Sequence, residues 1–339
     1  MKIKAVERAS LRSVINRFPR QRVVLLGDLV ADEFLYGEIS RVSREAPVLI
    51  LKQREKSVVP GGGANAANNL ADLGAQVEPV GVVGEDDTGE ALLGYFQQKG
   101  VSTRRIVRLG DYATPTKTRI LGGLAHWQRQ QIVRVDREPP GALRRAIRQQ
   151  LSECALSLLP GTSALLVSDY GYGATDAREV EFLRGHGARL GRALPITVDS
   201  RYDLLSYKRV TAATPNEPEI EEAVGQEIGD NLELLHRLGR KVLLRQGLQA
   251  LLVTRGRDGM VLFERRRAPR QIPIFGSDQA VDVTGAGDTV VAAFTLALAA
   301  GASFLHAAQL ANYAAGLVVM KRGTATVTAQ ELKEAIRNA

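Results

Sequence analysis

Residues 282–289, Asp-Val-Thr-Gly-Ala-Gly-Asp-Thr, combine an anion-binding backbone with a carboxylate placed where phosphate charge would gather. They run directly into an apolar stretch, 290–300, that predicts a buried helix. The first amides of a helix have no partners within it, and with the helix dipole they favour an anion. A carboxylate beside that anion is costly unless it has a chemical task. We interpret the junction as a phosphoryl-transfer site; the structural alternative is a glycine-rich helix start with a capping aspartate.

Asp288 is the candidate catalytic base, which takes a proton from an attacking hydroxyl. The amides of Gly285, Ala286 and Gly287 are the candidate anion hole for the transferring phosphate oxygens. We expect the helix N-terminus to keep Asp288 ionised, which would also make it a weak base. Phosphoryl transfer tolerates a weak base because it depends mainly on positioning and charge stabilisation.

The segment 214–219, Thr-Pro-Asn-Glu-Pro-Glu, carries a second pattern. Asn216 and Glu219 are three residues apart, which places both side chains on one face of a first helical turn. Mg²⁺ keeps several waters and takes few protein ligands, so Glu219 can act through water. A helix cap with acidic residues in the first turn fits the same letters.

Side chains suited to a polyol occur in two further segments. Asp32 lies shortly after the first apolar run, and Asn65 follows Gly62 and Gly63. Carboxylate and amide groups bind adjacent hydroxyls, and glycines let a sugar ring approach the backbone. The alternatives are a turn residue at a strand end for Asp32 and a helix N-cap for Asn65.

Several cationic side chains are candidates for gripping a second anion on the substrate, such as a sugar phosphate. Converging Lys and Arg side chains bind phosphate well, whereas the alternative for each is a solvated charged face. The candidates are Arg41, Arg44, Lys117, Arg119 and Arg201.

The elements that must position these residues alternate along most of the chain. Continuous Val/Leu/Ile runs are typical of strands that helices cover on both faces, and they occur at Arg22–Gly27, Val77–Val83, Ala164–Ser168, Ile196–Asp199, Val210–Ala213 and Ala250–Thr254. Amphipathic patterns between them predict helices at 64–73, 89–98, 143–158 and 232–244. The alternation predicts a doubly wound, mainly parallel α/β sheet with helices on both faces, in one domain over residues 1–339.

Two segments, 33–59 and 112–136, break this rhythm with strand-like alternation and no helix between. They predict a small antiparallel sheet inserted into the main body. Such a sheet suits a lid that covers a substrate and excludes water. The alternative is an extra edge layer of the core.

Composition and charge narrow the class of protein. The chain of 339 residues is 45% hydrophobic and 24% charged, which fits a globular enzyme. The single cysteine excludes a disulfide framework, no apolar run reaches the ~18 residues of a membrane span, and the start lacks a secretory core. We therefore expect a cytoplasmic protein without a membrane partner. The net charge of +8 comes from scattered Lys and Arg, which favours a small anionic substrate over nucleic acid.

Four motifs in this order resemble those of the ribokinase-like (PfkB) carbohydrate kinases, and the chain is identified as a member of that family over essentially its whole length. The motifs are Gly27–Asp32, Pro60–Asn65, Thr214–Glu219 and Asp282–Thr289. The resemblance implies a ribokinase-like fold, with ATP and Mg²⁺ used to transfer the γ-phosphate to a hydroxyl of a small sugar or sugar phosphate. It implies that Asn216 and Glu219 serve phosphate and metal, and that lids of this type pair in a homodimer.

The same resemblance implies a nucleotide side and a cation site. Thr254, Gly256 and Gly259 resemble a nucleotide-binding loop, and Asn312 lies in a late helix that lines the adenine pocket in the family. Asp282 is implied near a monovalent cation such as K⁺, which many relatives use.

Within the family, four segments resemble the D-glycero-β-D-manno-heptose 7-phosphate kinases: 36–48, 168–173, 281–289 and 311–316. They imply heptose 7-phosphate as acceptor and the 1,7-bisphosphate as product, in a kinase without the adenylyltransferase domain fused to some relatives. Departures fall in segments expected to face the substrate, with Tyr172 for lysine, Ser200-Arg201 for Pro-Lys and Arg44 for proline. A ribokinase- or fructokinase-like kinase of an unphosphorylated sugar, and a catalytically silent sensor, therefore remain as alternatives.

Overall fold

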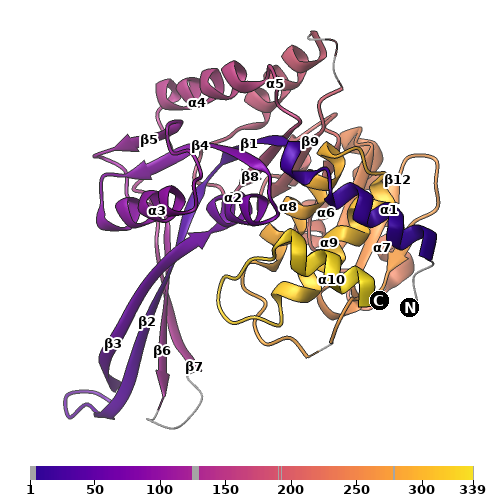
Figure 1. The fold of residues 1–339 in the computed structure, drawn as a ribbon. Coiled ribbons are helices and arrows are strands. Elements are labelled where there is room, and N and C mark those ends of the chain that lie inside the picture. Colours follow the sequence, from indigo (N-terminus) through magenta and orange to yellow (C-terminus); the bar gives the residue numbers. More distant parts are fainter. Residues whose placement is uncertain (1–4, 124–129, 190, 192, 278, 339) are drawn as a thin grey trace.

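The computed structural model describes residues 5–338 except 124–129, 190, 192 and 278. In this part of the chain, nine strands form one sheet in the order β13-β12-β11-β10-β9-β8-β1-β4-β5 (Figure 1). The pairings from β11 to β5 are parallel, and those of β12 and β13 are antiparallel. The strands are β1 (Arg22–Gly27), β4 (Gln76–Gly84), β5 (Ile106–Leu109), β8 (Ala164–Asp169), β9 (Ile196–Ser200), β10 (Ala212–Ala213), β11 (Ala250–Thr254), β12 (Met260–Glu264) and β13 (Arg270–Ile272).

Helices cover both faces of this sheet, as the continuous apolar strands predict. In β1, Val23 and Leu25 belong to one buried cluster, and Val24 and Leu26 belong to the other. The first face packs against α1 (Ala5–Ile15), α2 (Gly62–Asp72), α3 (Asp87–Gln98), α8 (Ala286–Ala299), α9 (Phe304–Val318) and α10 (Ala329–Asn338). The second packs against α4 (Arg145–Leu158), α5 (Ala177–Arg189), α6 (Glu217–Val224) and α7 (Leu232–Gln246).

Four strands form a second sheet, which we call the arm; it projects from the body as a long ribbon (Figure 1). They are β2 (Leu29–Val42), β3 (Leu49–Gly61), β6 (Thr116–Gly123) and β7 (Gln130–Arg137), in the order β3-β2-β6-β7. The outer pairings are antiparallel, whereas β2 and β6 pair in parallel because both strands start at the body and run outward. The arm is a sheet of its own, separate from the nine-stranded sheet, and it projects from the body. The alternative, that these segments form an extra layer at the edge of the core, is therefore wrong. Residues 124–129 of the predicted lid lie outside the described residues.

No helix in the described ranges is long and apolar enough to cross a membrane.

Candidate active site

The candidate residues gather where parallel strands end and helices begin. The parallel register places Gly27 beside Ser168 and Ser168 beside Asp199, so β1, β8 and β9 end at the same edge of the sheet. The first turns of α2, α6 and α8 start at this edge. Open α/β sheets bind ligands at such carboxyl ends.

Asp288 lies in the first turn of α8, and its side chain is buried. Asn65 Nδ2 donates to Asp288 Oδ2 at 2.9 Å, and the Tyr170 hydroxyl donates to Asp288 Oδ1 at 2.7 Å. Each carboxylate oxygen therefore has one donor from the protein and one lone pair left for a substrate hydroxyl.

The expectation that the helix N-terminus keeps Asp288 a weak base is wrong. Burial raises the pKa of Asp288 to about 7, against the hydrogen bonds from Asn65 and Tyr170, and the charges of Asp199 and Asp32 raise it further. Desolvation disfavours the charged carboxylate more than the helix end favours it. A carboxyl group with this pKa is a stronger base at neutral pH than an ordinary aspartate.

The candidate anion hole has fewer free amides than predicted. Gly285 is the N-cap of α8 with φ of 76°, a left-handed conformation that glycine adopts without strain. The Ala286 amide donates to the Val283 carbonyl at 3.2 Å. The described part of the chain gives the amides of Gly285 and Gly287 no backbone partner, so these two are the available donors.

Asn65 is not an N-cap, because α2 begins three residues earlier with Gly61 as its N-cap. The glycines before it are required by the protein's own packing. A Cβ on Gly62 would lie 2.8 Å from Val30 Cγ2, and one on Gly63 would lie 2.6 Å from the Asp28 carbonyl oxygen. Close packing of α2 on β1 and β2 brings Asn65 to Asp288.

Asp32 is paired within the protein. Arg119 Nη1 donates to its Oδ1 at 2.6 Å, and Thr324 Oγ1 donates to its Oδ2 at 2.6 Å. Asp32 and Arg119 were separate candidates for hydroxyl and anion binding, but in the structure they neutralise one another. Asp32 is therefore not a simple strand-end turn residue, and its contacts join the arm to the C-terminal segment.

The other cationic candidates divide into two groups. Lys117 Nζ lies 4.8 Å from the centre of the Tyr170 ring, and burial together with the nearby Arg201 lowers the pKa of Lys117. Arg41 pairs with Ile50 near the end of β2, nine residues beyond Asp32, which is ~30 Å along a strand. Arg44 follows in the exposed connection to β3. Within one chain, Lys117 and Arg201 thus lie at the site, whereas Arg41 and Arg44 lie far from it.

Asn216 and Glu219 form a capping box at the start of α6. Asn216 Oδ1 accepts from the Glu219 amide at 2.8 Å, and Glu219 Oε2 accepts from the Asn216 amide at 2.9 Å. The interpretation as a helix cap is therefore correct, but both side chains are also accessible from a cavity. Both still line a polar cavity of about 160 Å³. Its other lining residues are Asp169, Tyr170, Asp199, Arg201, Thr214, Thr254 and Gly287.

Asp199 faces Glu219 in this cavity. Burial, then the charge of Glu219, raises the pKa of Asp199 to about 7, and burial also raises the pKa of Glu219. The two neighbouring carboxylates make it costly for both to be ionised without a nearby cation. Their oxygens are hard ligands of the kind that a divalent cation such as Mg²⁺ prefers.

A larger, mostly apolar cavity of about 380 Å³ opens beside Gly287. Four of the predicted nucleotide-side residues line it: Thr254, Gly256, Gly259 and Asn312. Asn312 Nδ2 donates to the Pro273 carbonyl at 2.9 Å, which fixes its amide, while Val290 and Val319 supply apolar wall. A flat heteroaromatic ring fits this chemistry.

Asp282 ties two loops together beside the start of α8. Its carboxylate accepts from the Thr284 amide at 2.9 Å and from the Gly323 amide at 2.9 Å. Partial burial raises the pKa of Asp282, but these hydrogen bonds outweigh it and hold the pKa below its usual range.

Three important residues escaped the sequence analysis as site residues: Asp28, Tyr170 and Asp199. Asp28 accepts from the amides of Tyr170, Tyr172 and Ala174 at 2.8–3.0 Å, and thereby shapes the loop that carries Tyr170. The signals in the sequence were the place of all three at or within two residues of the end of a predicted strand, and the occurrence of Asp28 in the motif Gly27–Asp32 and of Tyr170 in the segment 168–173.

Comparison with solved structures shows that the chain has a ribokinase-like fold. An Arabidopsis thaliana ribokinase solved with ribose and ATP aligns with a TM-score of 0.71 at 20% identity, covering 94% of this chain and 98% of that one. Phosphofructokinase-2 from Escherichia coli, solved with potassium, aligns with a TM-score of 0.75 at 19% identity and the same coverage. At these identities the likeness establishes the fold.

The family model of the pfkB family carbohydrate kinases matches residues 20–331, and the chain belongs to this family. It is a phosphotransferase that acts on a sugar hydroxyl, and membership implies the use of ATP. Among curated proteins it is similar to the bifunctional protein HldE of Pelobacter propionicus, with 39% identity over 332 residues and 98% of this chain. HldE of Desulfatibacillum aliphaticivorans is 38% identical over 96% of the chain. The chain spans only 66% and 65% of these two relatives.

Proposed function

We propose that this kinase transfers the γ-phosphate of ATP to D-glycero-β-D-manno-heptose 7-phosphate and forms the 1,7-bisphosphate. The observation that carries the reaction is the buried Asp288 carboxylate beside two available amides at the start of α8. The acceptor is supported by the likeness of residues 36–48 and 168–173 to heptose 7-phosphate kinases and by the similarity to the bifunctional HldE proteins.

Asp288 accepts the proton of the acceptor hydroxyl while that oxygen bonds to the γ-phosphorus and the bond to the β-phosphate oxygen breaks. Its pKa of about 7 suits this task near neutral pH. The amides of Gly285 and Gly287 hold the phosphate oxygens as negative charge moves across them.

The remaining substrate contacts follow from the cavities. Adenine occupies the apolar cavity at Asn312, and the phosphates point towards Gly287, which lines both cavities. Asp199, Glu219 and Asn216 hold Mg²⁺, directly or through water. A bound Mg²⁺ neutralises charge on the phosphate oxygens. A monovalent cation such as K⁺ binds near Asp282, a proposal supported by the structure of phosphofructokinase-2 in complex with potassium.

Lys117 and Arg201 grip the 7-phosphate of the acceptor, and its hydroxyls lie near the Asp32–Arg119 pair. An unphosphorylated sugar is the second candidate acceptor. It is favoured by Tyr172, which stands where heptose kinases usually have lysine and lies near Glu138 and Asp136, whose charges repel phosphate.

ATP consumption with heptose 7-phosphate, ribose and fructose separates the two acceptors. We expect turnover with heptose 7-phosphate, and a rise in its KM of about tenfold or more in Arg201→Ala, as for loss of a charge-assisted contact. Full activity on an unphosphorylated sugar that Arg201→Ala leaves unchanged would assign the second candidate.

The base is tested by Asp288→Asn, which keeps the shape and removes the proton acceptor. We expect kcat to fall by about 10³-fold or more, while ATP binding, measured by calorimetry, stays within about twofold because the apolar cavity is intact. Comparable turnover in this variant would remove Asp288 from the mechanism.

Two broader proposals accompany this function. Residues 1–339 act as one kinase domain in the cytoplasm, with the arm as its lid. Two copies associate through their arms, where apolar side chains are exposed.

A further inference from the structure

We propose that Asn69, which has no direct contact with Asp288, is a positioning residue for the catalytic base: it fixes the Asn65 amide so that its N–H group, and not its carbonyl, faces Asp288. This inference rests on the proposed role of Asp288. It concerns a buried residue one turn beyond Asn65 on α2.

Asn69 is the centre of a buried chain of hydrogen bonds. Thr289 Oγ1 donates to Asn69 Oδ1 at 3.0 Å, and Asn69 Nδ2 donates to Asn65 Oδ1 at 3.1 Å. Asn65 Nδ2 then donates to Asp288 Oδ2 at 2.9 Å. Asn65, Asn69 and Thr289 are fully buried, so water does not substitute for a missing partner.

Backbone carbonyls set the direction of this chain, because they accept and never donate. Asn69 Nδ2 donates its second hydrogen to the Asn65 carbonyl oxygen at 3.0 Å. A reversed Asn69 amide would place two acceptors against each other there. Asn65 Nδ2 also lies 3.4 Å from the Gly285 carbonyl, which favours the same direction. The amide assignments therefore do not depend on telling oxygen from nitrogen.

The consequence for Asp288 is electrostatic. With Asn69 in place, Asn65 presents a donor to the ionised carboxylate, which stabilises the charged form. A turned Asn65 would present its carbonyl oxygen and favour the protonated, inactive form. The other titratable groups around Asp288 are Tyr170, Asp199, Asp32 and Lys117, and Asn69 contacts none of them in the hydrogen bonds described.

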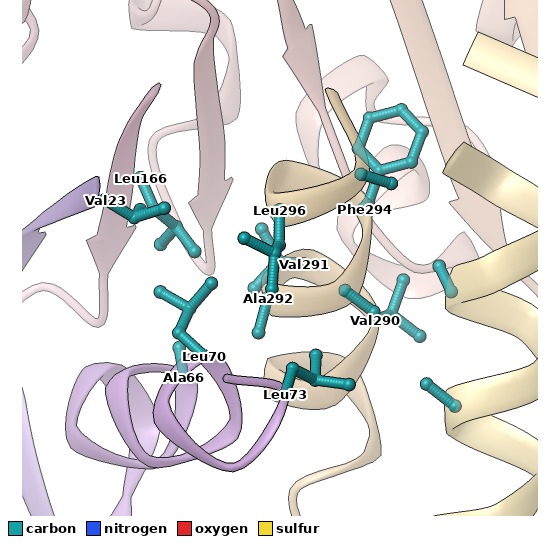
Figure 2. Packing of buried hydrophobic residues seen from close by; sticks show 14 of the residues in the cluster. Val23, Ala66, Leu70, Leu73, Leu166, Val290, Val291, Ala292, Phe294 and Leu296 are labelled. Carbon is teal, nitrogen blue, oxygen red and sulfur yellow. The ribbon is translucent and has the colours of Figure 1, made fainter. Parts of the chain in front are cut away.

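The packing of α2 against α8 does not depend on these hydrogen bonds. Figure 2 shows Ala66 and Leu70 of α2 close to Val291 and Ala292 of α8, and these side chains belong to one fully buried cluster. Apolar contacts thus hold α2 against α8. The buried hydrogen bonds of Asn69 are therefore not needed for helix packing and can orient the Asn65 amide.

The test is the pH dependence of kcat/KM in Asn69→Leu, with heptose 7-phosphate or whichever panel sugar supports turnover. Leucine has a similar size and no donor, so Asn65 Oδ1 loses the hydrogen bond that helps to fix its amide against Asp288. We expect the acidic limb of the profile to move upward by about half a pH unit or more, with ATP affinity unchanged. Asn69→Ser is the second variant, because its hydroxyl can still bond the Asn65 carbonyl but lacks a second donor for Asn65 Oδ1; it should move the limb likewise.

Asn68→Leu is the matched control. Asn68 is the neighbouring buried asparagine of α2, and its Nδ2 donates to the Tyr95 hydroxyl at 3.3 Å, away from Asp288. It should change stability without moving the limb. If neither Asn69 variant moves the limb while Asp288→Asn is inactive, Asn69 is structural only and the kinase mechanism stands. If Asp288→Asn keeps its turnover, the base assignment and this inference both fail.

Discussion

At the scale of single residues, Asp288 shows that a helix N-terminus does not by itself decide the state of a carboxyl group. The dipole and free amides favour the anion by up to ~2 kcal/mol, whereas full burial can shift a carboxyl pKa by several units in the opposite direction. The start of the helix can be recognised in the sequence, whereas the burial of Asp288 cannot. This is why a catalytic role for Asp288 could be proposed from the sequence, whereas its raised pKa could not be predicted.

The pH dependence of the wild-type enzyme follows from that balance. Asp288 must be ionised to accept a proton, and burial raises its pKa to about 7. We therefore expect kcat/KM to rise with pH through about 7 and to fall roughly tenfold per unit below it. A rate that stays level down to pH 5 would contradict both the raised pKa and the role of Asp288.

At the scale of elements, most of the scaffold could be predicted from local patterns. β1 has the predicted bounds, and α2, α3, α4 and α7 occur where amphipathic patterns placed them. β10 shrinks from the expected 210–213 to two residues. The site was harder to predict, because the partners of Asp28, Tyr170 and Asn69 are distant in the sequence or depend on which side of α2 is buried. Asn65 was predicted as a site residue, but its contact with Asp288 depends on how two helices pack.

The loop after β8 gives a prediction at this scale. Asp28 accepts three amides of residues 170–174, and burial raises its pKa to about 6 although those bonds lower it. Asp28→Asn replaces one acceptor oxygen with a donor that faces these amides. We expect stability, measured by urea unfolding, to fall by about 1–3 kcal/mol, and kcat to fall because Tyr170 shifts away from Asp288.

Asp176→Asn is the control for this loop. Asp176 Oδ1 also accepts a backbone amide, that of Arg178 at 2.7 Å, at the start of α5. It should lose some stability and keep kcat. Equal kcat values in the two variants would show that the loop does not position Tyr170.

At the scale of the whole molecule, the arm exposes apolar side chains to solvent. Val133 and Val135 of β7 are 46% and 54% exposed and project from the same face, since strand side chains alternate. Other exposed apolar side chains of the arm and its β2–β3 connection are Val42, Val48, Leu49 and Ile132. Exposed apolar patches of this kind mark interaction surfaces.

We expect the wild-type protein to be a dimer at micromolar concentration and the Val133→Lys, Val135→Lys double variant to be a monomer, as measured by light scattering after size exclusion. The substitutions are on exposed positions, so the thermal midpoint should change by only a few degrees. A wild-type monomer, or a double variant that stays dimeric, would refute association through this face.

The contact between Asp32 and Thr324 spans 292 positions of the chain, and the Asn65–Asp288 contact spans 223. Closing such long loops costs entropy before any contact repays it, so folding of this architecture is slow. During synthesis on the ribosome, the first half of the sheet is made long before α8 covers one of its faces. The nascent chain therefore exposes apolar surface for many seconds at ~5–20 residues per second, and chaperones have their main opportunity to bind it before residue 324 emerges.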